Sequence, residues 1–304
     1  MRLSRRLISL PTGRRTPLTN RPADTLPRVV HADREFLVVC KPHGMASAAL
    51  RAGETGTLVA WVSEHYPEVA SVRGRKAVEG GLLHRLDTAT AGLLVFARSQ
   101  AAWSAAHDAA EQGGFRKRYR AHCTPAQRTA RDAWPFLGAG PALAAGTDIV
   151  SAFRAWGPGR RRVAPLEHGE PCYRTRVLGI SAPDAPGPAQ PGAAQTATTE
   201  ADIAYPDTVY PLEIEVELAR GFRHQVRAHL AWCGYPITGD SLYDGTPVAR
   251  AGSARPAGPQ SPAPGAPATD APAPGAPPQR IGLVACAVEL RLPDRSLSVQ
   301  LPEC

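Results

Sequence analysis

The chain has 304 residues, of which 43% are hydrophobic, and its formal net charge at pH 7 is +8. This length and composition suit one large domain or two small ones around a buried core. No apolar stretch reaches the roughly 18 residues that a membrane-spanning helix needs, so we expect no membrane partner. The six cysteines are scattered without a C-x-x-C pair, which predicts reduced thiols and no zinc or other metal site.

The N-terminal segment is strongly basic. Residues 1–25 contain six arginines and one acid, Asp24, so they carry +5 of the net charge. We expect a disordered arm that contacts phosphates, followed by one folded domain over residues 26–304. The same composition, rich in arginine and poor in acids, is also typical of mitochondrial transit peptides. The sequence therefore predicts a cytoplasmic protein, with a mitochondrial location as the alternative.

The first part of the folded region predicts short strands and a helix. Apolar runs on both sides of a turn at residues 31–34 predict two strands within residues 28–40. Thr57 is placed to cap a helix over residues 58–66. Residues 68–80 then form a basic loop that contains glycine.

The next part predicts a strand, a helix and a second strand. Leu93–Phe96 is a short apolar run and predicts a buried strand. Ser99 begins a helix with alanines along one side, which Gly113 and Gly114 end. A second strand is predicted over Tyr119–Cys123.

The middle of the chain is difficult to assign from its sequence. Scattered prolines, a basic run and a segment rich in Ala, Pro and Gly predict a flexible insertion over about residues 124–200, with a candidate strand at Tyr173–Ile180. Leu212–Leu218 alternates apolar and polar residues and predicts a half-buried strand. His224–Cys233 predicts a helix whose buried stripe contains Val226, Leu230 and Cys233.

A second flexible insertion is predicted near the C-terminus. Residues 246–279 contain ten prolines and ten alanines, so they cannot bury enough apolar area to offset their ordering entropy. Leu283–Leu292 and Ser296–Leu301 then alternate around a Pro-Asp-Arg turn and predict a β-hairpin. Because strands and helices follow no βαβ repeat, the pattern favours the α+β class.

The most informative run is GLLHRLDTATAGLLVFAR at residues 81–98, which places Asp87 between two apolar segments. A carboxylate at the edge of a core costs several kcal/mol unless it is paired. One interpretation is a turn aspartate that binds its own backbone before a strand. The other is a functional carboxylate.

This run resembles the catalytic motif of the RluA-type RNA pseudouridine synthases, in which HRLD is followed by T-x-x-x-G-L-L-V-F-A. Three further blocks resemble the family in the same order: KPHGM at 41–45, KRYRA at 117–121, and GFRHQVRAHLAWCGYPITGDSLYDG at 221–245. The resemblance implies the pseudouridine synthase fold, a mixed and largely antiparallel sheet with flanking helices and a central catalytic cleft. It also implies a catalytic domain without an S4 RNA-binding domain, for which the first 25 residues are too few.

The resemblance implies roles for three residues. Asp87 matches the catalytic carboxylate, which attacks the sugar or assists deprotonation of its carbon 2. Arg227 matches the cation that keeps this carboxylate ionised. Tyr119 matches the tyrosine that packs on the target uracil. Taken alone, Arg227 would be a surface helix residue and Tyr119 an ordinary strand tyrosine.

The resemblance also predicts RNA contacts. The predicted RNA-binding residues are Arg85, His84, Lys41, Lys117 and His224. Arg85 matches the residue that fills the space left by a flipped base, and His84 supports the loop. The lysines, together with Arg116 and Arg118, are candidate phosphate contacts, although each is also an ordinary solvated charge.

Two positions depart from the family pattern. The usual G-R-T-H-Q reads Gly221, Phe222, Arg223, His224 and Gln225, and the usual histidine of the C-terminal L-H-A reads Cys286. Contacts around these positions are therefore open.

These observations predict an RNA pseudouridine synthase that isomerises uridines in ribosomal or transfer RNA, with no cofactor, as a monomer. The alternative is a non-catalytic RNA-binding protein on the same fold, which the loss of Asp87, Tyr119 or Arg227 would have favoured. The sequence contains no G-x-S-x-G and no G-x-x-x-x-G-K, which argues against a serine hydrolase and a P-loop enzyme.

Overall fold

The computed structural model describes residues 26–51, 53–126, 134–181, 212–243 and 280–302. The predicted basic arm at 1–25 and the second predicted insertion at 246–279 lie outside the described residues. Residues 127–133 and 182–200 of the first predicted insertion do so as well.

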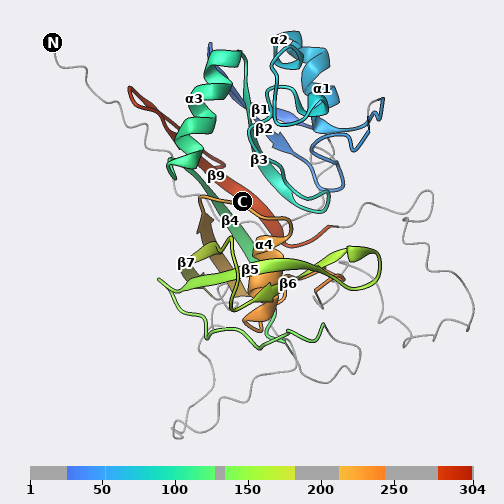
Figure 1. Cartoon of the computed structure of the whole chain (residues 1–304), viewed down its shortest axis with the longest axis vertical. Coiled ribbons are helices and arrows are strands. Elements are labelled where there is room, and N and C mark those ends of the chain that lie inside the picture. The colour runs from blue at the N-terminus through green and yellow to red at the C-terminus, as the bar shows by residue number, and fades with distance from the viewer. Residues whose placement is uncertain (1–25, 52, 127–133, 182–211, 244–279, 303–304) are drawn as a thin grey trace, which may run out of the picture.

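The described strands form one mixed sheet of ten strands in the order β1-β2-β3-β9-β4-β8-β7-β5-β6, with β10 paired to β9 (Figure 1). β3 and β9 pair in parallel, and the other pairs are antiparallel. The strands are β1 (Arg28–Ala32), β2 (Phe36–Lys41), β3 (Ala91–Ala97), β4 (Phe115–Cys123), β5 (Asp148–Trp156), β6 (Arg162–Leu166), β7 (Tyr173–Ser181), β8 (Leu212–Leu218), β9 (Leu283–Arg291) and β10 (Ser296–Gln300). This mixed, largely antiparallel α+β fold confirms the predicted class.

The helices begin where the sequence places their caps. The side chains of Thr57 and Ser99 accept hydrogen bonds from backbone N–H groups three residues later, at 3.2 and 3.1 Å. These bonds satisfy donors that the first turn leaves unpaired. The described helices are α1 (Leu58–His65), α2 (Pro67–Ala70), α3 (Gln100–Glu111) and α4 (Gln225–Trp232), with 3-10 turns η2 (Ala77–Glu79) and η3 (Pro158–Arg160).

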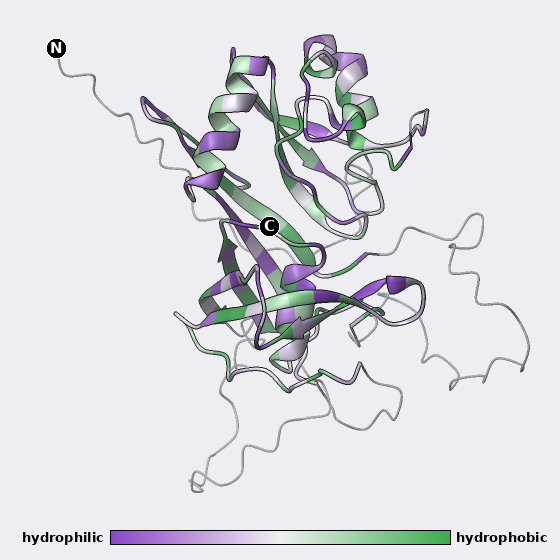
Figure 2. Ribbon diagram, in the orientation of Figure 1, coloured by the Kyte–Doolittle hydropathy of each residue, from purple (hydrophilic) through white to green (hydrophobic). Residues whose placement is uncertain are grey.

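Two hydrophobic clusters lie on the two faces of β2 and β3. Leu94 and Phe96 belong to the cluster that includes α1 and α4, whereas Leu93 and Val95 belong to the cluster that includes α3. Because side chains alternate between faces along a strand, a strand buried on both sides has an unbroken apolar sequence. All seven residues of β3 are buried, and β3 and β9 appear green in Figure 2.

The contact between β3 and β9 is short. Only two residue pairs are in register, Ala91 with Val284 and Gly92 with Ala285. Gly92 has a φ of 118°, and a side chain there would collide with the backbone of Ala285, so the close approach requires glycine. α3 packs against both strands. The junction joins the part of the sheet with β1 to β3 to the part with β4 to β10 (Figure 1).

The predicted insertion over residues 124–200 is wrong where β5 and β6 lie, between residues 148 and 166, whereas the candidate strand at Tyr173–Ile180 is confirmed as β7. Each strand contributes a buried apolar residue to the core, Ile149, Val163 and Val177 respectively, and α4 packs against β6 and β7. The sequence concealed β6 because it contains Pro165, which is tolerated in an edge strand.

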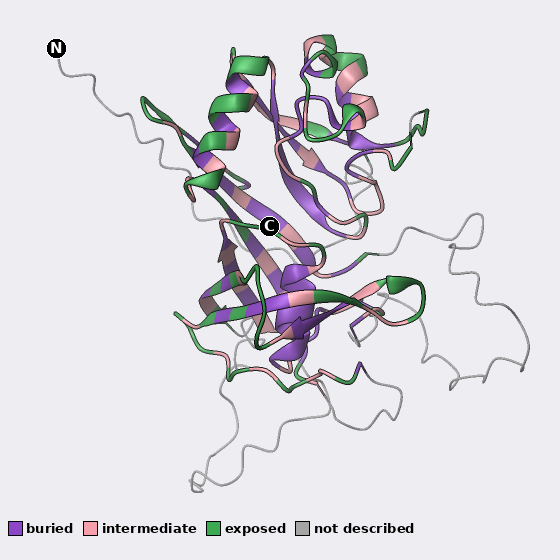
Figure 3. Cartoon of the chain, in the orientation of Figure 1, coloured by how far each residue is buried: buried purple, intermediate pink, exposed green. Residues whose placement is uncertain are grey.

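The helix α4 is more deeply buried than a single apolar stripe predicts. All eight of its residues are buried, and Figure 3 shows the helix buried along its whole length, in contrast to the exposed outer side of α3. A helix surrounded by protein lacks a polar face, so its apolar periodicity is weak. None of the helices in the described ranges is long and apolar enough to cross a membrane.

Candidate active site

Asp87 lies in a tight turn immediately before β3. The backbone N–H of Thr90 donates to the carbonyl of Asp87 at 3.0 Å. Leu86 is buried, and its backbone is bonded in both directions by Ser47, whose hydroxyl donates to the Leu86 carbonyl at 2.6 Å and accepts from its N–H at 3.0 Å. The side chain of Asp87 is 24% exposed, so the carboxylate remains accessible from solvent while its backbone is held in place.

The KPHGM segment holds the same turn from the other side. Gly44 N–H donates to the Thr88 carbonyl at 2.8 Å, and the His43 ring bonds the Ala89 carbonyl at 2.7 Å. Lys41 Nζ donates to the carbonyls of Met45 at 2.7 Å, Pro42 at 3.1 Å and Thr88 at 3.4 Å. These bonds attach the Asp87 turn to the end of β2.

Lys41 is therefore not the phosphate contact that the sequence predicted. The residue is completely buried, and its ammonium group donates hydrogen bonds to backbone carbonyls. Burial lowers the pKa of Lys41 to about 8, although the nearby charge of Asp87 acts in the opposite direction.

Arg227 faces Asp87 as the sequence predicted. Its Nη1 donates to Asp87 Oδ2 at 3.2 Å, and only 3% of the arginine side chain is exposed. A guanidinium stays charged in such a place and binds carboxylates through several donors. The helix α4, which carries Arg227, thus reaches the turn that carries Asp87.

Asp240 is a second partner of Arg227 that the sequence reasoning missed. Its two oxygens accept from Nε at 2.6 Å and from Nη2 at 2.8 Å, and Asp240 is fully buried. Burial alone would lower the pKa of Arg227, but the hydrogen bonds and charge of Asp240, with a further contribution from Asp87, raise it above its ordinary value. The acid in the G-D-x-L-Y part of the third block was the sequence signal for this partner.

Tyr243 and His224 complete the surroundings of the ion pair. The Arg227 guanidinium lies 5.4 Å from the centre of the Tyr243 ring, a distance typical of cation–π contacts. His224 caps α4 with a positive φ of 57°, and its Nε2 lies 3.9 Å from Asp87 Oδ2. Burial, together with the charges of Arg227 and Arg223, lowers the pKa of His224 to about 4 although Asp87 opposes the shift. The ring is therefore neutral at pH 7.

The side chain of His224 is 13% exposed, and its predicted RNA contact stays a prediction. Both protein groups that face Asp87 approach the same oxygen, Oδ2. Among the described residues no hydrogen bond is made to Oδ1. One oxygen of the carboxylate is thus held by the protein, and the other accepts no hydrogen bond from the part of the chain that the structure describes.

Tyr119 lies on β4 and is buried. Burial and the nearby charge of Asp87 raise its pKa well above the ordinary value. The phenol therefore stays protonated and is suited to packing on a ring, whereas it is a poor base as it stands.

Of the remaining predicted RNA-binding residues, one is exposed, one is half-buried and one is buried. Arg85 is 44% exposed and lies 3.5 Å from Glu79. Lys117 donates to the Ala219 carbonyl at 2.6 Å, and burial lowers its pKa to about 8. His84 packs edge-on against Phe115 at 5.1 Å, and burial lowers its pKa. Lys117 and His84 are thus occupied by contacts within the protein, whereas Arg85 is exposed; the RNA contacts predicted for the three residues stay predictions.

Arg116 and Arg118 alternate along β4 with the buried Lys117 and Tyr119, so they lie on the opposite face of the strand from Tyr119. Both bind Glu217 of β8 at 3.0 Å. Their side chains are 44% and 51% exposed, so their predicted phosphate contacts stay a prediction, on the face of β4 opposite Tyr119.

The departures at positions 222 and 223 have structural explanations. Phe222 stacks on Phe153 of β5, with ring centres 5.2 Å apart. Arg223 donates to the carbonyl of Arg162 at 3.1 Å and to that of Arg160. These two residues therefore tie the start of α4 to the β5–β6 hairpin. Cys286 lies 3.5 Å from the Arg118 carbonyl.

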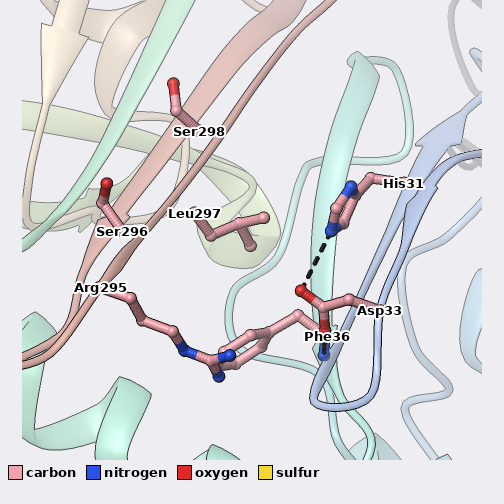
Figure 4. Close-up of a pocket in the computed structure, with 7 residues that line it drawn as sticks. All are labelled: His31, Asp33, Phe36, Arg295, Ser296, Leu297 and Ser298. Atoms are coloured by element: carbon pink, nitrogen blue, oxygen red, sulfur yellow. Dashed lines mark hydrogen bonds and ion pairs between the residues drawn. The ribbon is translucent and has the colours of Figure 1, made fainter. Parts of the chain in front are cut away.

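A hollow of about 180 Å³ lies apart from these residues, between the β1–β2 turn and β10 (Figure 4). The Arg295 guanidinium lies over the Phe36 ring and is paired with Glu35, while His31 is bonded to Asp33 at 3.2 Å. Arg295 and His31 both have acidic partners, so the hollow is a weak candidate for binding phosphate. No group of three or more His, Cys, Asp or Glu in the described ranges is arranged to hold a metal ion.

The chain is similar to several known RNA pseudouridine synthases. A family model described as RNA pseudouridylate synthase matches residues 35–176. An uncharacterized RNA pseudouridine synthase of Bacillus subtilis is 29% identical over 222 residues, which cover 71% of this chain and 57% of that protein. One of Chloroflexus aurantiacus is 31% identical over 204 residues, covering 67% of this chain and 50% of that protein. The chain belongs to the RNA pseudouridylate synthase family.

The ribosomal large subunit pseudouridine synthase D of Pseudomonas aeruginosa is 25% identical to this family member over 218 residues, covering 71% of this chain and 53% of that protein. The structure of human RNA pseudouridylate synthase domain containing 1 has the same fold, with a TM-score of 0.53, 18% identity, and coverage of 94% of this chain and 86% of the other. The chain spans only about half the length of the curated relatives it matches.

Proposed function

We propose that this protein is an RNA pseudouridine synthase in which Asp87 is the catalytic carboxylate. The observation that carries the proposal is the contact between Asp87 Oδ2 and Arg227 Nη1 at 3.2 Å, on a turn fixed by the KPHGM segment. An ionised carboxylate that is held by one oxygen and open at the other suits attack on a sugar carbon or removal of a proton.

The reaction is an isomerisation, so no atom is gained or lost. The bond between N1 of uracil and C1′ of ribose breaks, the base turns, and C5 bonds to C1′. N1 gains a proton and C5 loses one. Asp87 acts either by bonding to C1′ through Oδ1 and leaving again, or by taking the proton of C2′ and returning it. In both routes Arg227 stabilises the carboxylate whenever it is ionised.

Tyr119 and Arg85 supply the environment of the base. Tyr119, protonated and buried beside Asp87, offers a flat ring on which uracil can pack. Arg85 is exposed at the start of the same turn, where a planar guanidinium can occupy the gap that a flipped nucleotide leaves in its RNA stack. The reaction needs no cofactor and no metal.

The substrate class that we propose is ribosomal RNA, because one relative carries the name ribosomal large subunit pseudouridine synthase D. Transfer RNA is the second class. We further propose that the protein acts as a monomer in the cytoplasm, with a mitochondrial location as the alternative.

The proposal is tested by release of tritium from RNA labelled at C5 of uridine. Asp87→Asn keeps the shape of the side chain but removes its charge, so we expect turnover to fall by several orders of magnitude while RNA binding and folding persist. Asp108→Asn is the matched control, because Asp108 is an exposed carboxylate on α3. Turnover of Asp87→Asn near that of the control would exclude the assignment, and binding without turnover in the wild type would favour a non-catalytic RNA-binding protein. Pseudouridine mapping in cells with and without the protein identifies the RNA.

A further inference from the structure

The ring of His224 is held between two residues of the candidate active site. Its Nδ1 lies 3.1 Å from the hydroxyl of Tyr243, and its Nε2 faces Asp87 Oδ2 at 3.9 Å. The ring is neutral at pH 7, with a pKa of about 4 because of burial and the neighbouring Arg227 and Arg223. A neutral imidazole has one N–H and one acceptor nitrogen, so its effect on Asp87 depends on which nitrogen carries the proton.

The surroundings of Tyr243 determine that choice. The Tyr243 hydroxyl accepts a hydrogen bond from the backbone N–H of Val163 at 2.9 Å. Its own proton is then free for a second partner, and within the described part of the chain the hydroxyl's other hydrogen-bond neighbour is His224 Nδ1. Burial raises the pKa of Tyr243 above its ordinary value, so the phenol keeps its proton and donates it. Nδ1 is therefore the acceptor, and Nε2 carries the ring proton.

The backbone of His224 is in an unusual conformation for this position. Its φ of 57° lies in the left-handed region, which few non-glycine residues adopt, Asn, Asp and His more often than the others, and which is often found at functional sites. The His224 carbonyl accepts from Ala228 N–H at 2.9 Å, so the residue begins the helix that carries Arg227. The two groups that face Asp87 Oδ2 thus come from the first turn of one buried helix.

We propose that His224 is a positioning residue that donates its Nε2 proton to Oδ2 of Asp87, in a tautomer set by Tyr243. This inference rests on the proposed catalytic role of Asp87. His224 and Arg227 would together hold Oδ2, so that Oδ1 is the oxygen that reacts with the sugar. The separation of 3.9 Å in the ligand-free structure is longer than a hydrogen bond. Catalytic hydrogen bonds are often long without substrate and tighten in the complex.

The tautomer is measured directly by NMR of the full-length protein labelled with ¹⁵N in its histidine rings. We expect Nε2 of His224 to be protonated at pH 7 and Nδ1 to be unprotonated. In Tyr243→Phe the preference for this tautomer should weaken. A proton on Nδ1 in the wild type, or a doubly protonated ring at pH 7, would overturn the proposal. This measurement needs no turnover, so it decides the tautomer even if Asp87→Asn shows that the proposed function is wrong.

Kinetics on the RNA substrate test the role of the proton. Asn tolerates a positive φ but is too short to reach Asp87, so His224→Asn should lower kcat about 10-fold to 100-fold, the range for a hydrogen bond to a charged group, with little change in KM. His224→Gln can place an amide N–H near the position of Nε2 and should recover part of kcat. His65→Gln, at an exposed histidine bonded to the Trp61 carbonyl, is the control. A raised KM with unchanged kcat in His224→Asn would show an RNA contact instead, and no recovery in His224→Gln would also contradict the proposal.

Discussion

Asp240 binds Nε and Nη2 of Arg227 at 2.6 and 2.8 Å, so that Arg227 approaches Asp87 with Nη1 alone, at 3.2 Å. One guanidinium therefore binds two carboxylates, and Asp240, which is fully buried, accepts two of its hydrogen bonds. The bond to Leu242 N–H at 3.1 Å orients Asp240 in turn. Asp87 thus receives one charge-assisted hydrogen bond through Oδ2, while no described residue bonds its other oxygen.

Asp240→Asn should impair both stability and turnover. The substitution leaves a buried guanidinium with one carboxylate, which we expect to cost about 2 kcal/mol of unfolding free energy, less than a wholly unpaired buried charge. Arg227 would then turn toward both oxygens of Asp87, and kcat should fall. Urea unfolding and single-turnover kinetics measure the two effects, with Asp108→Asn as the control. Wild-type values of both quantities would show that Asp240 does not orient Arg227.

Arg227→Lys should lower kcat by about 10-fold to 100-fold. An ammonium group cannot reproduce the planar set of N–H donors with which the guanidinium binds Asp240 and Asp87 at once. The matched control is Arg291→Lys, because Arg291 binds Glu289 at an exposed position. Comparison of kcat for the two variants isolates the role of the planar guanidinium. Equal kcat values would mean that positive charge alone is sufficient at position 227.

The burial of Lys41 should appear in the pH dependence of stability. Its pKa is about 8 in the folded protein, whereas the ordinary pKa of a lysine, which we expect in the unfolded chain, is 10.5. Between these values the unfolded chain binds more protons than the folded one, so the contribution of Lys41 to unfolding free energy rises as pH rises. Relative to Lys41→Met, the wild type should gain up to about 3 kcal/mol over this range. Denaturant titrations from about pH 7.5 to about pH 10.5, in about half-unit steps, give the difference. Parallel curves for the two proteins would contradict this prediction.

Removal of residues 1–25 should weaken RNA binding at low salt without changing the modified uridine. These residues carry +5, and each arginine that contacts a phosphate contributes about 0.7 to 0.9 to the slope of log K against log salt. Binding measured across a salt series should therefore show a shallower slope, while pseudouridine mapping reports the same site. A shifted site would mean that the arm reads RNA sequence or shape.

The sequence predicted the elements whose signals are local. The caps at Thr57 and Ser99, the alternating strand β8 and the β9–β10 hairpin all lie where their patterns place them. The contact between Asp87 and Arg227, 140 residues apart, was predictable only through the resemblance of ordered motifs, since no periodicity relates residues in different elements.

Other features depend on tertiary contacts that a single sequence does not display. Lys41 resembles any solvated lysine until its bonds to three carbonyls are known. Asp240 resembles a turn residue until Arg227 lies against it. β6 is short and contains Pro165, and β5 shows no regular alternation of apolar and polar residues, so the sequence does not distinguish these two from loops. They become strands because α4 and the sheet bury their apolar residues.

The two-residue junction at Gly92 has a consequence for how the proposed activity depends on distant residues. Asp87 lies on the β3 side of the junction, and Arg227 and Tyr119 lie on the other side. The separation of the proposed catalytic groups therefore depends on the angle at which the two parts of the sheet meet. Ala106 of α3 and Val288 of β9 share the hydrophobic cluster on which α3 rests. A bulkier side chain at either position would change the angle between the two parts of the sheet. Turnover would then change although no residue of the proposed RNA site is substituted.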